Sequence, residues 1–231
     1  MDPGDVTALH VYQYMDERGK RSHVQANREL ALLQAGFKKA VRWGDVSVSP
    51  VVKIERFKEY PRKRYVQDWE LEAFKEHAGH LIAAYIDFQY LTALRQGDIL
   101  RIRLSEIKDD GIYVRISKTG QERIITWTTA LKEAVRNARS LARPVRGMYL
   151  FCTRTGSPYT SNGFQSNWQR SIRSALKAGV LRERFTTIDI RAKSASDAND
   201  LARAQDLLGH ANSKVTKVHY RRLAERVEPL K

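Results

Sequence analysis

The stretch LRIRLSEIKDDGIYVRISKTGQERIITW, residues 100–127, decides the fold. Apolar and polar residues alternate along it, which is the two-residue period of a strand with one buried face. Two turn signals, DDG at 109–111 and KTG at 118–120, divide the stretch into three segments. The pattern therefore predicts a three-stranded antiparallel meander.

The sequence on either side of this stretch has the character of helices. DWELEAFKEHA (68–78) begins a helix, and LIAAYIDFQYLTAL (81–94) is an apolar helix. Further helices are predicted over 129–142, 161–178, 189–202, 204–208 and 212–224. Gly209 is expected to close the helix over 204–208 in the left-handed conformation. The predicted fold is therefore mainly α with one small three-stranded antiparallel sheet, an α+β class.

The first 60 residues are predicted to form a separate helical region. Val6, Leu9 and Tyr12 recur every three residues, and SHVQANRELALLQAGFKKAVRWG (22–44) has helical spacing and ends on glycine. The segment 47–65 contains two prolines and a basic cluster, which is typical of a linker. We place the boundary at residue 61, which gives regions 1–61 and 62–231. The first is expected to have a thin core, because so small a region buries little surface.

Composition excludes several classes of protein. The 231 residues are 42% hydrophobic, which is enough for a core and excludes a wholly disordered basic tail. No stretch approaches the ~20 apolar residues of a transmembrane helix. The N-terminal residues lack the pattern of a signal peptide, so a cytoplasmic protein is expected. The single cysteine, Cys152, excludes an internal disulfide and a zinc site built from cysteines.

Positive charge is concentrated in the C-terminal half of the chain. The whole chain has a formal net charge of +15 at pH 7. Residues 1–120 carry 20 basic and 17 acidic side chains, whereas residues 121–231 carry 21 basic and nine acidic ones. Such a field attracts polyanions, of which nucleic acid is the commonest. Charge alone leaves two alternatives open: a solvated face that serves only solubility, and a membrane surface as the partner.

Four short segments hold a set of candidate functional residues. In chain order they are YLTALRQGD with Arg95, ISKTGQ with Lys118 at a hairpin tip, IDIRAKSASDA with Arg191, and DLLGHANSKVTKVHYRR with His210 and Tyr220. Each residue alone is weak evidence, because most arginines are solvated or ion-paired and most tyrosines lie in cores or interfaces. The ordered set resembles the catalytic domain of the tyrosine recombinases, the phage integrase family, over about residues 66–231.

These residue types can supply the chemistry that a tyrosine recombinase needs to cut DNA. Cutting DNA without a metal requires a nucleophile, cations at the transition state and a proton for the leaving 5′ oxygen. Arg95 and Arg191 can each bind phosphate oxygens through two hydrogen bonds. The resemblance implies that Lys118 is the general acid and that His210 hydrogen-bonds the scissile phosphate. It also implies that Tyr220 is the nucleophile, whose phenolate the neighbouring cations stabilise.

Two features depart from the pattern of the family. Ile188 occupies the position three residues before Arg191 where the family usually has His. Loss of a general acid–base group typically slows chemistry by about 10²–10⁴-fold. His219 is a poor replacement, because neighbouring helical positions point about 100° apart. The second departure is that residues 1–61 resemble only the later helices of a core-binding domain.

The resemblance implies a site-specific DNA recombinase that acts through a 3′-phosphotyrosyl intermediate and needs no metal, ATP or other cofactor. The implied partners are double-stranded DNA and accessory DNA-bending proteins. Copies of the chain are also expected to assemble on the DNA, up to a tetramer. A phage, a prophage or another mobile element is the implied origin. The alternative is an integrase-like protein that only binds DNA, which Ile188 and the short N-terminal region favour. An RNA-binding protein would explain the charge but not the ordered residues.

Overall fold

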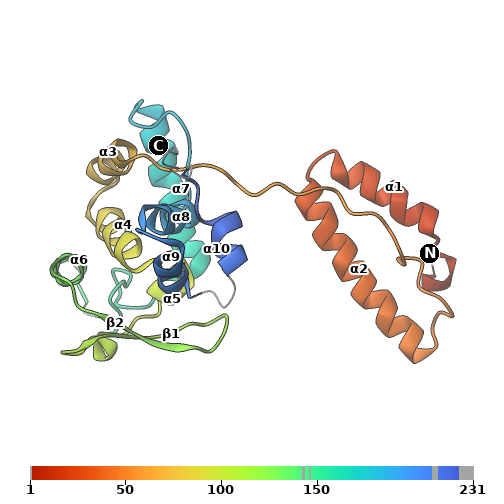
Figure 1. The fold of residues 1–231 in the computed structure, drawn as a ribbon, viewed down its shortest axis with the longest axis horizontal. Coiled ribbons are helices and arrows are strands. Elements are labelled where there is room, and N and C mark those ends of the chain that lie inside the picture. Colours follow the sequence, from red (N-terminus) through yellow and green to blue (C-terminus); the bar gives the residue numbers. More distant parts are fainter. Residues whose placement is uncertain (1, 142–143, 146, 210–212, 224–231) are drawn as a thin grey trace, which may run out of the picture. The chain divides into compact units, whose positions relative to one another are not determined.

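The computed structural model of the chain describes residues 2–141, 144–145, 147–209 and 213–223 (Figure 1). The chain divides between Pro61 and Arg62 into two compact units. None of the helices in these described ranges has the length and apolar character needed to cross a bilayer.

The first unit is built from two helices that pack against each other. A short 3-10 helix, η1 (Pro3–Asp5), precedes α1 (Ala8–Gly19), and α2 (His23–Trp43) follows. The side chain of Thr7 caps α1, and that of Ser22 caps α2 by accepting a hydrogen bond from the Gln25 N–H. Gly44 ends α2 in the left-handed conformation (φ 83°), as its position in the sequence predicted.

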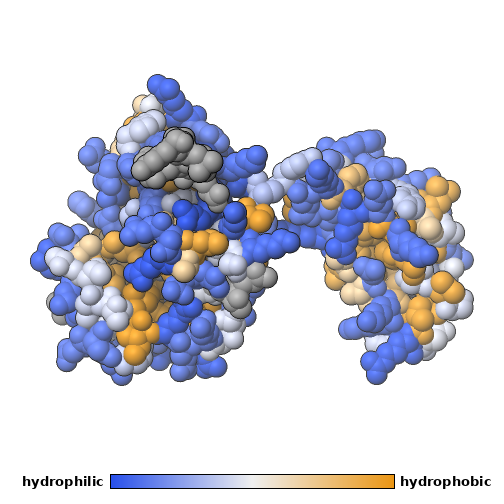
Figure 2. Space-filling view, in the orientation of Figure 1, coloured by the Kyte–Doolittle hydropathy of each residue, from blue (hydrophilic) through white to orange (hydrophobic). Residues whose placement is uncertain are grey.

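The segment after α2 returns along the helices and closes the small core of this unit. Phe57 stacks on the His23 ring with centroids 4.4 Å apart. The buried Asn27 side chain donates to the Phe57 carbonyl (2.8 Å) and accepts from the Phe57 N–H (2.9 Å). Outside the core, Leu32 and Trp43 remain 75% and 70% exposed, and Figure 2 shows hydrophobic residues on the surface of this unit.

The second unit is mainly helical, as predicted, with a small antiparallel sheet. Its elements in chain order are α3 (Asp68–Ala78), α4 (His80–Thr92), α5 (Gln96–Ile99), η2 (Leu104–Glu106), β1 (Gly111–Arg115), β2 (Glu122–Thr126), α6 (Thr129–Arg139), α7 (Ser161–Lys177), α8 (Thr187–Asp197), α9 (Leu201–Leu208) and α10 (Ser213–His219).

The predicted third strand is wrong: in the described residues the sheet consists of β1 and β2, with Tyr113 opposite Ile124. The expected first strand contains η2 instead. Its backbone pairs with a distant segment: the Leu104 N–H donates to the Met148 carbonyl (2.8 Å) and the Leu150 N–H donates to the Ile102 carbonyl (2.9 Å). The apolar–polar alternation in residues 102–104 therefore reflects this pairing.

The C-terminal helices end at other residues than predicted. The helix expected over 189–202 is divided, because Asp200 accepts a hydrogen bond from the Arg203 N–H (2.7 Å) and caps α9. The helix expected over 212–224 ends at His219, and residues 210–212 and 224 lie outside the described residues. Tyr220 is therefore in the turn that follows α10.

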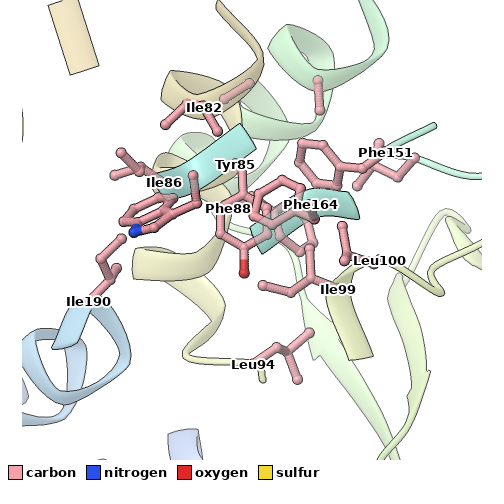
Figure 3. Close-up of a cluster of buried hydrophobic side chains, with 14 of the residues drawn as sticks. Ile82, Tyr85, Ile86, Phe88, Leu94, Ile99, Leu100, Phe151, Phe164 and Ile190 are labelled. Carbon is pink, nitrogen blue, oxygen red and sulfur yellow. The ribbon is translucent and has the colours of Figure 1, made fainter. Parts of the chain in front are cut away.

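The core of the second unit fixes the helix that carries Arg191. Figure 3 shows aromatic rings of α4 and α7 packed together, with Ile190 of α8 at the edge of the cluster. The rings of Tyr85 and Phe164 lie 4.3 Å apart, and Ile190 is fully buried. Because α8 also contacts α4 and α9 (Figure 1), its rotation about its own axis is fixed.

Candidate active site

Arg191 is the buried centre of the candidate site. Its side chain, on α8, is 3% exposed. Nη2 donates to the Leu208 carbonyl at the end of α9 (2.6 Å), and Nη1 donates to the Ala93 carbonyl at the end of α4. Ala93 has a left-handed backbone (φ 49°), which directs the chain from α4 toward Arg95. One guanidinium thus joins the ends of two helices.

Arg191 and Arg95 place two cations close together. Burial lowers the pKa of Arg191 to about 10, and repulsion from Arg95 acts in the same direction. The interaction with Tyr220, which includes a hydrogen bond, and the charge of Asp98 both oppose this shift. Arg191 is still protonated at neutral pH, so the site presents concentrated positive charge to an anion.

Arg95 lies at the start of α5, directly after the turn that ends α4. Its Nη1 atom is buried and has no hydrogen-bond partner among the described residues. A buried polar group without a partner is rare and costly in folded proteins. The arrangement therefore suits a ligand that supplies the missing acceptor, such as a phosphate oxygen.

Asp98 connects the Arg95 helix to the hairpin that carries Lys118. It is buried, and its Oδ1 accepts from the Ser117 N–H (3.0 Å) and the Ser117 hydroxyl (2.6 Å). Lys118 follows immediately in the turn between β1 and β2, where it is exposed. The anchoring role of Asp98 was missed from sequence.

Tyr220 lies next to Arg191 of the same chain. The guanidinium carbon of Arg191 is 5.5 Å from the centre of the Tyr220 ring. The half-buried ring also packs on a cluster of small and apolar residues, Ala93, Ala195, Ala204 and Leu208. The turn after α10 is held by the Thr216 carbonyl, which accepts from the N–H groups of residues 220 and 221 (both 3.0 Å). Arg95, Arg191 and Tyr220 are thus brought into one region.

Of the two positions where the family has histidine, 188 and 210, the structure describes the first. Ile188 lies in the first turn of α8 and is 59% exposed, so the position where the family usually has His opens to the surface. His210 lies outside the described residues. Gly209, just before it, has the left-handed conformation (φ 66°) that was predicted for the end of this helix. His219 is exposed at the end of α10.

Arg123 is a further residue of this region that sequence reasoning missed. From β2, it donates through Nη1 to the Asp206 carbonyl in the last turn of α9. Its guanidinium lies against Gly209, where an added Cβ would come within 3.0 Å of the Arg123 Cζ. Arg123 therefore ties the strand after the Lys118 turn to the helix end before His210. The alternating strand pattern gave no signal for this role.

In the residues that the structure describes, no group of three or more His, Cys, Asp or Glu side chains is arranged to hold a metal ion. The site offers the buried guanidinium of Arg191, the partly buried one of Arg95, the exposed ammonium of Lys118, and the Tyr220 phenol beside Arg191.

Residues 70–226 match the model of the phage integrase family, and the chain belongs to this family. The family consists of tyrosine recombinases, so the general function is site-specific DNA recombination, and the resemblance seen in the sequence is confirmed. The chain is 24% identical over 237 residues to tyrosine recombinase XerD of Listeria innocua, covering 95% of this chain and 77% of that protein. XerD of Listeria monocytogenes is similar to the same extent.

Solved structures show the same fold. Lambda integrase (75–356), in a dimer bound to a COC′ core site, superposes with a TM-score of 0.82 at 21% identity and covers 99% of this chain and 85% of its own. The Tn1549 transposon integrase (82–397), in complex with circular intermediate DNA, gives 0.73 at 14% identity, covering 98% and 84%.

Proposed function

We propose that the chain is a site-specific recombinase that cuts and rejoins double-stranded DNA through a covalent bond between Tyr220 and a 3′ phosphate. The observation that carries this proposal is the position of the Tyr220 ring, 5.5 Å from the buried Arg191 guanidinium of the same chain. Binding DNA requires cations but no phenol beside them. A phenol placed against a buried arginine, which itself lies near a second arginine, suits nucleophilic attack on a phosphodiester.

In the proposed cleavage step, the Tyr220 oxygen attacks the phosphorus while its proton passes to solvent, because Ile188 cannot accept it. The bond from phosphorus to the 5′ oxygen breaks, and the Lys118 ammonium donates a proton to that leaving oxygen. Attack by a 5′ hydroxyl on the phosphotyrosine reverses the step and releases Tyr220. The energy of the broken bond is kept, so rejoining needs no ATP.

The arginines supply the electrostatic part of catalysis in this proposal. Arg191 is held by the carbonyls of Ala93 and Leu208, so its charge is already in place before DNA binds. The buried Nη1 of Arg95 offers a donor to a non-bridging phosphate oxygen. Donors fixed in advance near developing negative charge are usually the largest catalytic contribution. His210 is proposed as a further donor to the same phosphate.

Residues 62–231 are proposed as the catalytic domain and residues 1–61 as part of a core-binding region, with assembly of several copies on DNA. The lambda integrase dimer on a core site and the lambda integrase tetramer on a Holliday junction (TM-score 0.79, 21% identity) support this assembly. The exposed basic side chains of 121–231 are expected to contact phosphates, so DNA affinity falls steeply as salt rises. The Tn1549 neighbour supports an origin in a mobile element.

The second candidate function is DNA binding without cleavage, which one observation favours. Ile188 offers neither a proton acceptor nor a hydrogen bond, and its exposed side chain gives an apolar surface where the family usually has imidazole. A protein of this kind would occupy recombination sites and modulate an active recombinase.

Covalent trapping on nicked DNA distinguishes the two functions. A bound site is first selected from random-sequence duplexes, and a nick is then placed so that the cleaved strand diffuses away. We expect wild-type protein and Tyr159→Phe to form an adduct that survives denaturant, and Tyr220→Phe to bind equally but form none. An adduct with Tyr220→Phe overturns the assignment of the nucleophile. No adduct from wild-type protein at a site that it demonstrably binds favours the binding function.

A further inference from the structure

The chain that follows Tyr220 is docked on its own α8 through a buried arginine. Arg222 has a side chain that is 4% exposed. Its Nη1 donates to Asp189 Oδ1 (2.5 Å) and to the Arg64 carbonyl (2.5 Å). Because this guanidinium is enclosed by its own chain, it is not placed to contact DNA as an exposed arginine would be.

The carboxylate that receives Arg222 is itself held firmly. Asp189 is fully buried in the first turn of α8. Its Oδ2 accepts from the N–H (2.8 Å) and hydroxyl (2.9 Å) of Thr186, and Oδ1 also pairs with Arg62 Nε (2.9 Å). A buried carboxylate with this many donors is fixed in orientation, so it gives Arg222 a defined docking point.

A second contact fixes the backbone on both sides of Arg221. The Ser196 hydroxyl accepts from the Arg222 N–H (2.8 Å) and shares its proton between the carbonyls of Tyr220 (2.9 Å) and Ala192 (2.8 Å). Ser196 lies near the end of α8, and Asp189 lies near its start. The helix that carries Arg191 therefore also carries both points that hold the backbone after Tyr220.

We propose that Arg222 is a positioning residue for the Tyr220 phenol, an inference that rests on the proposed role of Tyr220 as nucleophile. The ion pair with Asp189 and the contacts of Ser196 fix residues 220–222 on α8. The phenol is thereby held at a set distance from Arg191 on the same helix. Such placement matters, since misplacing a reacting group by about 1 Å can slow a reaction about 10²-fold. A buried ion pair is often retained for specific geometry rather than for stability.

Single-turnover cleavage of the nicked substrate at saturating DNA tests this role. Arg222→Ala is expected to cleave about 10²-fold more slowly than wild type. Arg221→Ala, which removes the same charge one position earlier, is the matched control and is expected to cleave at nearly the wild-type rate. Both variants should bind DNA alike. Arg222→Lys restores the charge opposite Asp189 and should recover part of the rate.

Hydrogen–deuterium exchange without DNA provides a second readout that does not depend on cleavage. Residues 213–223 should exchange faster in Arg222→Ala than in Arg221→Ala, with α4 and α7 unchanged. Ser196→Ala removes the hydroxyl that contacts the Ala192 and Tyr220 carbonyls and the Arg222 N–H, and it leaves no buried charge unpaired. It should therefore slow cleavage and speed exchange even if Arg222→Ala fails to fold. If Arg222→Ala and Ser196→Ala cleave and exchange like Arg221→Ala, the positioning role is wrong, while the proposed function stands. Absence of any wild-type adduct overturns the proposed function, and the positioning role with it.

Discussion

The two units of this chain are stabilised by different kinds of contact. Among the described residues, the first unit has a core of seven buried hydrophobic residues and leaves apolar side chains such as Leu32 exposed. The described part of the second has a main core of 27 buried hydrophobic residues, rich in aromatic rings packed edge to face. The burial of apolar area, which is the main favourable term in folding, is therefore concentrated in the second unit.

This difference in core size accompanies a difference in buried charge. In the described part of the first unit, the buried polar residue is the neutral Asn27. The second unit buries Asp189, Arg191 and Lys193. Lys193 is paired with Asp68 (2.5 Å) and Asp197 (3.0 Å). Buried charges are costly unless paired, so fixed charges of the kind that catalysis needs require a large and rigid core.

The largest expected effect concerns the two cores. Trp168→Ala should lower the free energy of unfolding of the second unit by about 3–5 kcal/mol, because it removes a fully buried ring that contacts three other aromatic rings. Phe37→Ala should unfold the first unit and leave the second folded. Hydrogen exchange resolved by peptide measures each unit separately. If Phe37→Ala also exposes the amides of α4 and α7, the two units do not unfold independently.

The next prediction compares the cleavage rates of variants at a buried arginine, Arg191, and at a partly exposed one, Arg18. Arg191→Lys keeps a charge but loses the planar pair of donors that bonds Ala93 and Leu208, so cleavage should slow by about 10²–10³-fold. Arg18→Ala breaks an ion pair with Glu29 in the first unit and should leave the rate at saturating DNA unchanged. Single-turnover rates on the nicked substrate check both. A wild-type rate for Arg191→Lys contradicts the proposed phosphate site.

A gain of activity is expected at Ile188. This side chain is 59% exposed, so Ile188→His should fold normally and place an imidazole one turn before Arg191. The cleavage rate should rise by up to about 10²-fold, the lower end of the range for a general acid–base group. Only the neutral imidazole can accept a proton, so the gain should increase with pH. Positive charge nearby lowers the pKa of the introduced His, so the gain should level off below the usual His pKa. Ile188→Asn is the polar control, and an equal gain from Asn would exclude a role for proton transfer.

The smallest effect tests how polar contacts support the thin core. Asn27→Ala removes three hydrogen bonds, two to the Phe57 backbone and one to Glu59. The free energy of unfolding of the first unit should fall by about 1–3 kcal/mol, while that of the second unit stays unchanged. Chemical denaturation followed by hydrogen exchange gives both values. No change in the first unit would mean that water replaces these hydrogen bonds without cost.

The sequence allowed prediction of the helical class, the helix ends at Gly44 and Gly209, and the resemblance to a known family, because periodicity, glycine caps and ordered motifs are local signals. It did not predict that residues 102–104 pair with 148–150, because that contact joins distant segments. The same reason applies to Arg222. Its partners Asp189 and Arg64 are far away in sequence, and nothing in its own neighbourhood distinguishes it from Arg221.

The measurement that tests the central claim most directly is the location of the covalent bond between protein and DNA. The adduct from the nicked substrate is digested with nuclease and protease, and mass spectrometry identifies the modified residue. We expect the phosphate on Tyr220, which lies beside Arg191 of its own chain. A phosphate on any other residue, or no adduct at a site that the protein binds, would contradict the account.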